Sequence, residues 1–162
     1  MSDGERPTHL DERGAVRMVD VGEKSVTVRR AVAQARVTMA PETAAAARAG
    51  DAPKGNIEAT VRLSAVMAAK RTPEVIPLCH AVQLTSVQVA VEWDERGATI
   101  TVASEARDRT GVEMEAMVGA SVGALALYDM VKGLERGVAI ERVVLLEKQG
   151  GRSGHWTREG GP

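Results

Sequence analysis

The sequence predicts an α+β domain in which helices pack on one face of an antiparallel sheet, in the chain order βαββαβ. Three observations predict this fold. Four segments have the alternation or composition of strands, helical signals separate the first strand from the second and the third from the fourth, and 162 residues is the length of one domain. With 44% hydrophobic residues, a chain of this length can bury a sizeable core without disulfides.

The first strand is predicted over residues 26–39, and a short helix follows it. Small apolar side chains occupy every second position from Ala31 to Met39, and polar side chains stand among the positions between them. Pro41 begins an alanine-rich helix, because proline suits the first turn of a helix, and this helix is expected to stop at Gly50.

The middle of the chain predicts a second helix and then a hairpin. Asn56 is expected to cap a helix over residues 57–71, which carries a face of small residues. Residues 84–93 and 98–107 both alternate with period two, and the polar segment 94–97 between them is typical of a tight turn.

The last third of the chain predicts a long helix and a final strand. Thr110 is expected to cap a helix over about residues 112–132, which Gly133 closes, and residues 138–148 form a strand rich in Val and Leu. With the two early helices merged, the order is that of the ferredoxin-like fold. The second face of such a sheet must be polar or covered, which favours oligomerisation through it.

The ends of the chain differ in composition from its middle. Residues 1–17 are interpreted as a flexible N-terminal arm, residues 18–148 as a single α+β catalytic domain, and residues 149–162 as a glycine-rich loop and tail. We find no signal peptide and no apolar stretch near 18 residues, so we expect no membrane span. A single cysteine, Cys79, permits no disulfide within the chain and favours a cytoplasmic location.

Charge and aromatic content exclude two classes of function. Lys+Arg is 21 and Asp+Glu is 22, and this balance argues against a protein that coats nucleic acid or an anionic membrane. The chain has no Phe, two Trp and one Tyr, so the aromatic platform on which ferredoxin-like RNA-binding domains stack bases cannot be assembled. A small-molecule regulatory domain and an enzyme with a site between subunits remain.

Lysine is rare among the cations, which draws attention to each lysine. Sixteen of the 21 basic residues are Arg. Lysine can give up its proton when it is buried or lies near other cations, whereas arginine effectively cannot. For any single lysine, chance placement on a solvated surface is an equally good explanation. The five lysines are Lys24, Lys54, Lys70, Lys132 and Lys148.

The most unusual segment is residues 76–80, which places Cys79 beside His80 after a turn expected at Thr72-Pro73. A histidine on a rigid loop can hydrogen-bond a polar ligand or relay a proton. The alternative, which this segment alone favours, is a packed turn whose histidine bonds a backbone carbonyl. One cysteine and three histidines without ligand spacing make a structural zinc site improbable.

Acidic residues stand at both ends of the predicted long helix. Its start, with Glu113 and Glu115 on different sides, suits an anion or a polar base edge, although acids there also complement the helix dipole. Near its end, Asp129 and Lys132 are adjacent on the helix surface, as an acid–base pair or an ordinary ion pair. Fourteen residues of helix separate Glu115 from Asp129 by about 21 Å. If both act in one site, two copies of the chain must form it.

Cations and glycines cluster in three further places. The segment 148–154 joins Lys148 and an arginine to bare backbone amides, which suit a phosphate group, although the P-loop pattern is missing. Lys54 lies in a similar segment, and Lys24 and Arg29 add two more cations. A triphosphate would use this many cations, whereas a neutral metabolite would not.

Taken together and in order, these segments resemble the MoaC family of molybdenum cofactor biosynthesis. The resemblance covers about residues 7–156 with no large gap, and the ordered set is far more specific than any one motif. The matching segments are Met18–Val21, Lys54–Asn56, Ala68–Thr72, Ile76–His80, Thr110–Ala116, Tyr128–Met130 and Gly150–Gly154.

The resemblance implies a ferredoxin-like subunit in a homohexamer, a trimer of dimers with the active site at the dimer interface. The implied lyase reaction converts 3′,8-cyclo-7,8-dihydro-GTP, made by the upstream radical SAM enzyme, to cyclic pyranopterin monophosphate and pyrophosphate. It implies no cofactor, with Mg²⁺ as an optional companion of the triphosphate, and it allows a transient contact with the upstream enzyme. The competing hypothesis is a non-catalytic nucleotide-binding regulatory module on the same fold.

The resemblance also assigns roles to residues. Asp129, Lys132 and Lys54 match the family's acid–base positions, and Lys70 receives a supporting role. The substrate-binding positions are the turn Leu78, Cys79 and His80, the helix start Glu113, Met114 and Glu115, and the cations Lys24, Arg29 and Lys148, which would face the triphosphate.

Three positions depart from the family pattern. Asn56 stands where an Asp is usual, Ala81 where Pro is common, and Arg152 where Lys is frequent. Arg152 still binds phosphate and Ala81 only softens a turn, whereas Asn56 removes a charge near Lys54 and so affects the tuning of that lysine's pKa.

Overall fold

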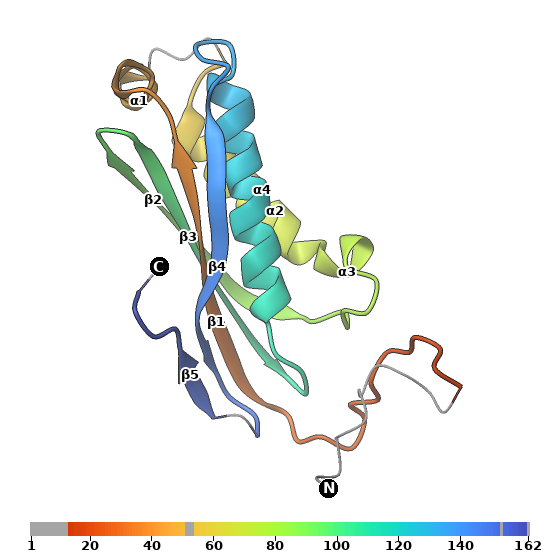
Figure 1. Ribbon diagram of the computed structural model, residues 1–162. Coiled ribbons are helices and arrows are strands. Elements are labelled where there is room, and N and C mark those ends of the chain that lie inside the picture. Colours follow the sequence, from red (N-terminus) through yellow and green to blue (C-terminus); the bar gives the residue numbers. More distant parts are fainter. Residues whose placement is uncertain (1–12, 51–53, 153, 162) are drawn as a thin grey trace, which may run out of the picture.

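The computed structural model describes residues 13–50, 54–152 and 154–161, which form one antiparallel five-stranded sheet with helices on one of its faces (Figure 1). The strands are β1 (Thr27–Thr38), β2 (Leu84–Asp94), β3 (Gly97–Asp108), β4 (Ala139–Gln149) and β5 (His155–Thr157), in the spatial order β2-β3-β1-β4-β5. The helices are α1 (Pro41–Ala49), α2 (Ile57–Lys70), α3 (Thr72–Val75) and α4 (Glu113–Val131).

The first four strands and the two long helices confirm the predicted ferredoxin-like arrangement. β1 lies in the centre of the sheet, antiparallel to both β3 and β4, and α2 and α4 lie side by side against the sheet (Figure 1). The local signals of the sequence act as predicted in α1 and α2. Gly50 ends α1 with φ +85°, and the Asn56 side chain accepts a hydrogen bond of 2.9 Å from the Ala59 amide at the start of α2.

Three local predictions need correction. Thr110 does not cap α4, which begins after Val112 without a side-chain cap, and Gly133 does not close it, because the helix ends in right-handed geometry at Lys132. The residue just before the helix, Val112, is buried. The turn expected at Thr72 is the short helix α3, in which the Thr72 hydroxyl donates 3.0 Å to the Ala69 carbonyl.

The glycine-rich tail also contains a strand that the sequence analysis did not predict. β5 pairs with β4, with Trp156 opposite Lys148, and extends the sheet beyond its four-stranded core. Of the predicted N-terminal arm, residues 1–12 lie outside the described residues, as do Ser153 and Pro162 of the predicted tail.

Small residues let α2 and α4 approach each other and the sheet closely. A Cβ atom added at Gly119 would lie 3.1 Å from Val102 and 3.2 Å from the Ala65 carbonyl, and one at Gly123 would lie 3.2 Å from Ile100. These distances leave no room for larger side chains, as an alanine-rich core requires. By length and composition α4 could cross a membrane, but half of it is buried in this core, as in the central helices of water-soluble proteins.

The sheet face opposite the helices is polar, as the alternation of β1 predicts. Arg30 spans three strands there, since its guanidinium lies 3.3 Å from Glu105 of β3 and 2.9 Å from Glu147 of β4. These pairs satisfy the charges on a face that one copy of the chain leaves uncovered.

Candidate active site

The predicted functional residues gather at the two ends of α4. The C-terminal end of α4 is at the top of Figure 1. Asp129, near this end, lies between two lysines. Its Oδ1 is 2.7 Å from Lys132 Nζ, one turn along the helix, and its Oδ2 is 2.7 Å from Lys54 Nζ, which precedes α2. The structure therefore brings the three predicted acid–base residues together, two from one helix and one from 75 residues earlier in the chain.

The electrostatics of this triad favour its charged form. Hydrogen bonds from Lys132 and then from Lys54 lower the pKa of Asp129 to about 2, and the hydrogen bond to Asp129 raises the pKa of Lys132. All three side chains are about half exposed, between 44% and 52%. In one chain by itself both lysines thus pair with Asp129, and a lysine needs further burial or another cation to become a base.

Asn56 continues to serve the backbone beside this triad. Its side chain caps α2, a role in which Asn and Asp are nearly equivalent. Asparagine thus provides the cap. The aspartate that the resemblance to the family predicts at this position would add an acidic charge two residues from Lys54.

At the N-terminal end of α4 a cavity of about 490 Å³ opens between three segments. They are an N-terminal segment around Val19, the turn at residues 76–80 and the start of α4. His80 Nε2 lies 2.8 Å from the Val19 carbonyl, which can only accept, so this nitrogen carries the proton. The lining residues are Val19, Val21, Lys24, Ile76, Leu78, Cys79, His80, Thr110, Gly111, Glu113 and Met114.

A second, strongly basic cavity of about 190 Å³ adjoins the first and shares part of its wall. The residues that line both cavities are Lys24, Thr110, Gly111 and Glu113. One acid, Glu113, balances part of the charge by pairing with Lys148 at 3.3 Å. The cations that line this basic cavity are Lys24, Arg29, Arg30, Arg109, Lys148 and Arg152.

Arg29 is held in place by the backbone around it. Its guanidinium donates to the carbonyls of Asp108 at 3.2 Å and Arg109 at 3.1 Å. On its other side Gly151 has φ +71°, and a Cβ atom there would lie 1.8 Å from Arg29 Nη1. Glycine at this position thus provides both the left-handed turn and the space for the guanidinium.

Sequence reasoning missed two parts of this site. Arg109 lines the basic cavity and donates 3.1 Å to the Lys24 carbonyl, and Val19 and Val21 form a wall of the larger cavity. Val19 and Val21 lie in one of the segments that resemble the family, and Arg109 lies directly before another. No local pattern, however, indicated that residues 19–24 would fold over the turn at His80.

Eight of the nine predicted substrate-binding residues line one or both of these cavities, and the ninth does not. Glu115 is 1% exposed and lies behind the wall, with its Oε1 3.7 Å from Cys79 Sγ. The acid–base triad is about 21 Å away along α4, so one chain cannot bring both clusters to one ligand.

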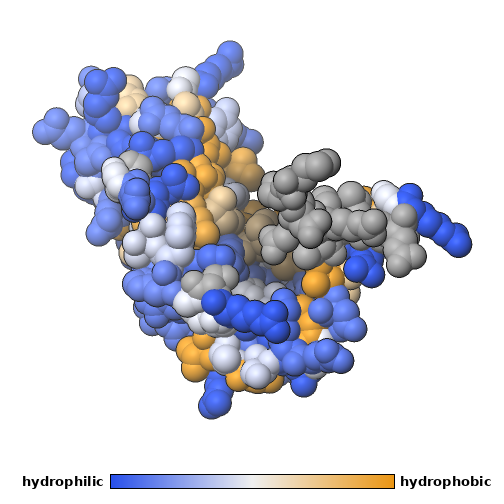
Figure 2. Space-filling view, turned by 60° about the horizontal axis from the view of Figure 1, so that its bottom comes forward, coloured by the Kyte–Doolittle hydropathy of each residue, from blue (hydrophilic) through white to orange (hydrophobic). Residues whose placement is uncertain are grey.

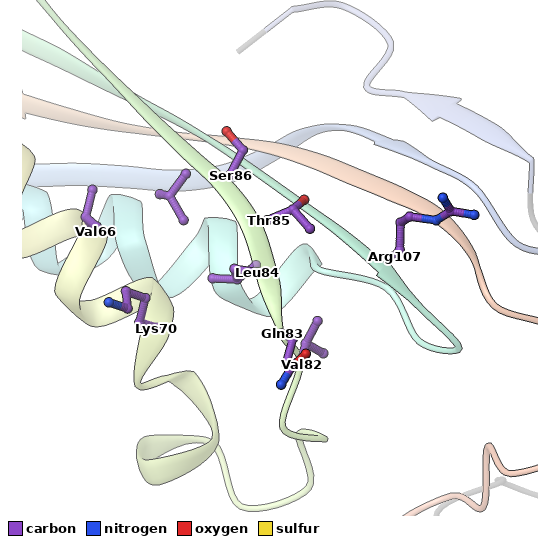
Figure 3. A pocket seen from close by; sticks show the side chains of 9 residues that line it. Val66, Lys70, Val82, Gln83, Leu84, Thr85, Ser86 and Arg107 are labelled. Atoms are coloured by element: carbon purple, nitrogen blue, oxygen red, sulfur yellow. The ribbon is translucent and has the colours of Figure 1, made fainter.

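A cavity of about 690 Å³, larger than either of these two, lies elsewhere, between the end of α2 and the start of β2 (Figure 3). Its only cationic side chains are Lys70, on α2, and Arg107, on β3, and no acid lines it. Apart from Lys70, for which only a supporting role is predicted, it contains none of the predicted site residues. Size alone therefore does not mark the functional site here.

The described residues contain no group of three or more His, Cys, Asp or Glu side chains that could hold a metal ion. The donors around the two cavities at the start of α4 are mainly lysine and arginine, which bind anions rather than cations.

Comparison with known proteins gives matches that span most of the chain. The model of the MoaC family matches residues 18–151. A cyclic pyranopterin monophosphate synthase from Thermomicrobium roseum is 52% identical over 154 residues, which are 94% of this chain and 93% of that protein.

Proposed function

The chain belongs to the MoaC family and is an enzyme of molybdenum cofactor biosynthesis, and we propose that it releases pyrophosphate from a cyclised GTP derivative. In the proposed reaction 3′,8-cyclo-7,8-dihydro-GTP becomes cyclic pyranopterin monophosphate, as the similarity to a synthase of that name implies. The observation that carries the proposal is the pair of adjoining cavities at the start of α4, one half-apolar and the other lined by six cations and one acid.

The two cavities suit the two halves of this substrate. The triphosphate would lie against Lys24, Arg29 and Lys148, with further charge from Arg109 and Arg152. Arginine side chains that are already fixed by backbone carbonyls bind a phosphate oxygen with little further ordering. The base and sugar would occupy the larger cavity, between His80 and Met114.

The acid–base chemistry in this proposal comes from a second copy of the chain. Asp129, Lys132 and Lys54 of one copy would meet the cavities of another at a dimer interface, in a homohexamer built as a trimer of dimers. Apolar side chains on the outer surfaces of α2 and α4 support association, since Leu63, Met67 and Leu125 are 44–62% exposed. One face of the molecule likewise shows orange hydrophobic patches on a hydrophilic surface (Figure 2).

Burial against a second copy would change the behaviour of the two lysines. Desolvation lowers the pKa of an ammonium group, so Lys54 and Lys132 could then exchange protons near neutral pH, while Asp129 holds them in place. Opening the dihydroimidazole ring and rebuilding it as a pterin requires several such transfers. The cations of the basic cavity would stabilise the charge that develops on the pyrophosphate as it leaves.

The proposal includes a cytoplasmic enzyme without a resident cofactor, with Mg²⁺ as an optional companion of the triphosphate. It also includes a transient contact with the upstream radical enzyme that supplies the substrate, because direct transfer shortens the time that a reactive intermediate spends in solution.

The deciding experiment mixes the purified protein with the cyclised dihydro-GTP substrate and measures pyrophosphate and, after oxidation, the fluorescent pterin. We expect both products together and neither with Lys132→Ala. Arg48→Ala, an exposed charge on α1 outside both clusters, is the matched control and should keep full activity. Binding without either product would favour the non-catalytic nucleotide-binding module.

A further inference from the structure

Glu115 is the one buried carboxyl group of the described residues, and neither cavity wall includes it. It lies on the first turns of α4 with 1% of its surface exposed. Its Oε1 is 3.7 Å from Cys79 Sγ, and its Oε2 is buried without a hydrogen-bond partner among the described residues. Burial raises the pKa of Glu115.

A favourable interaction with the helix dipole does not explain why the Glu115 side chain is buried. Glu113, two residues earlier, complements the N-terminus of α4 while its side chain stays one-third exposed and pairs with Lys148. An acid needs no burial for that effect, and burial is costly for a carboxyl group with one weak partner. Among the described residues, the one side-chain hydrogen bond to Glu115 comes from Cys79, which points to a role through that residue.

Cys79 is part of the turn that forms one side of the larger cavity. Its backbone amide donates 3.1 Å to the Ile76 carbonyl, and the next residue, His80, is tied to Val19. The thiol reaches inward from this turn to α4, 36 residues further along the chain. We propose that Glu115 is a positioning residue, which holds the Leu78–His80 turn against α4 through the Cys79 thiol.

This inference deepens the proposed function, on which its kinetic part rests, and it separates two roles for Glu115. A positioning residue needs an acceptor for the thiol, which glutamine also provides, and its loss would loosen the cavity and weaken substrate binding. A substrate ligand or acid–base group would need the carboxyl group itself, whose free Oε2 would accept from the substrate, so glutamine and alanine would be equally harmful.

Cys79 provides a readout that does not depend on turnover, because it is the only cysteine of the chain. Burial, followed by the charge of Glu115 and its hydrogen bond, raises the pKa of this thiol to about 11. The rate of alkylation by iodoacetamide as a function of pH follows the thiolate and therefore reports both the contact and the burial.

The experiment compares Glu115→Gln, Glu115→Ala and the control Glu113→Gln in the full-length protein. For Glu115→Ala we expect alkylation at pH 8 to rise at least about fivefold and KM to rise at least about fivefold, with kcat within about twofold. Glu115→Gln should keep KM within about twofold, with a smaller gain in alkylation because only the charge is lost. Glu113→Gln should leave the alkylation rate within about twofold, since Glu113 has the smallest effect on the pKa of this thiol.

Two results would overturn the inference. Unchanged alkylation in Glu115→Ala would show that the contact does not hold the turn, and an equal loss of kcat in both variants at Glu115 would show a direct role in the reaction. If Glu115→Ala does not fold, Cys79→Ser and Cys79→Ala decide, because serine keeps the donor to Glu115 and alanine does not, so KM should rise less with serine than with alanine. A wild-type protein that forms no product refutes the proposed function, while the alkylation series still tests the contact.

Discussion

The N-terminal end of α4 is largely complete in one chain, whereas its C-terminal end is not. Around the start of the helix, Arg29 is fixed by two carbonyls, His80 by a third, and Glu115 is buried against Cys79. At the other end, Asp129 and its two lysines rely on ion pairs that are half exposed to solvent. The half that would bind an anion is preformed, and the half that would move protons needs burial by something else. This difference agrees with the active site proposed above, which two copies of the chain would share.

The largest expected effect comes from the exposed end. Lys132→Ala should lower kcat by about 10²–10⁴-fold, the usual contribution of a general acid or base, and Lys54→Ala and Asp129→Ala should follow. The oligomer should persist, as measured by light scattering, because these side chains are not part of the core. Normal turnover in all three variants would contradict the proposed roles and remove the contrast between the two ends.

At the preformed end, binding should change more than turnover. Arg29→Ala removes a fixed guanidinium and should raise KM by about 10- to 100-fold, the value of one or two charge-assisted hydrogen bonds. The measured KM should also depend less steeply on salt than that of the wild type. An unchanged KM in steady-state kinetics would mean that the triphosphate binds elsewhere.

A matched pair of glycines tests how closely the loop must approach Arg29. Gly151 and Gly154 both have positive φ, but only at Gly151 would a Cβ atom meet Arg29, since nothing lies within 4 Å of one at Gly154. Each alanine substitution should cost about 1 kcal/mol of unfolding free energy for its backbone conformation. Gly151→Ala alone should also raise KM, by several-fold. Equal KM values for the two variants would show that Arg29 does not need this space.

The pH dependence of the triad should be visible in titration and almost absent from stability. Asp129 should titrate at about 2 in carboxyl NMR. Lys132→Ala should move this pKa up toward its ordinary value, because the hydrogen bond from Lys132, which has the largest effect on it, is lost. A lowered carboxyl pKa stabilises the fold above the unfolded-state pKa, and this contribution disappears as pH falls from about 4 toward 2. Screening by solvent at this half-exposed site keeps the contribution small, so acid unfolding of Asp129→Asn should resemble that of the wild type. A large shift of its acid midpoint would reveal burial in the oligomer.

The smallest effect is expected for Asn56→Asp. Both residues cap a helix equally well, so stability should change by less than about 0.5 kcal/mol in chemical denaturation. The added charge lies near Lys54 and should alter kcat by no more than about threefold at an exposed site. A much larger gain would show that the lysine is buried in the working enzyme.

The sequence predictions were correct where the interactions behind them act between residues that are close in the chain. The bounds of β1 and α1 and the cap at Asn56 were predicted correctly, because alternation, proline, glycine and capping side chains act within a few residues. The bounds of α4 were also close, with Glu113–Val131 observed against about residues 112–132 predicted, but the predicted cap at Thr110 was wrong, because no side chain caps this helix. β5 has three residues beside several glycines, and only its pairing with β4 makes it a strand.

The sequence by itself determined the ferredoxin-like order of elements, the family and the set of residues to examine, because these reside in local patterns and ordered motifs. The tertiary structure decided which of those residues meet. Val19 reaches His80 across 61 residues of chain, Arg29 reaches Arg109 across 80, and Cys79 reaches Glu115 across 36. Such contacts depend on how the whole sheet and its helices pack, and no local pattern in the chain encodes them. The length of α4 gives the clearest case, since the sequence predicted the separation of its two clusters and the structure showed that only one of them is preformed.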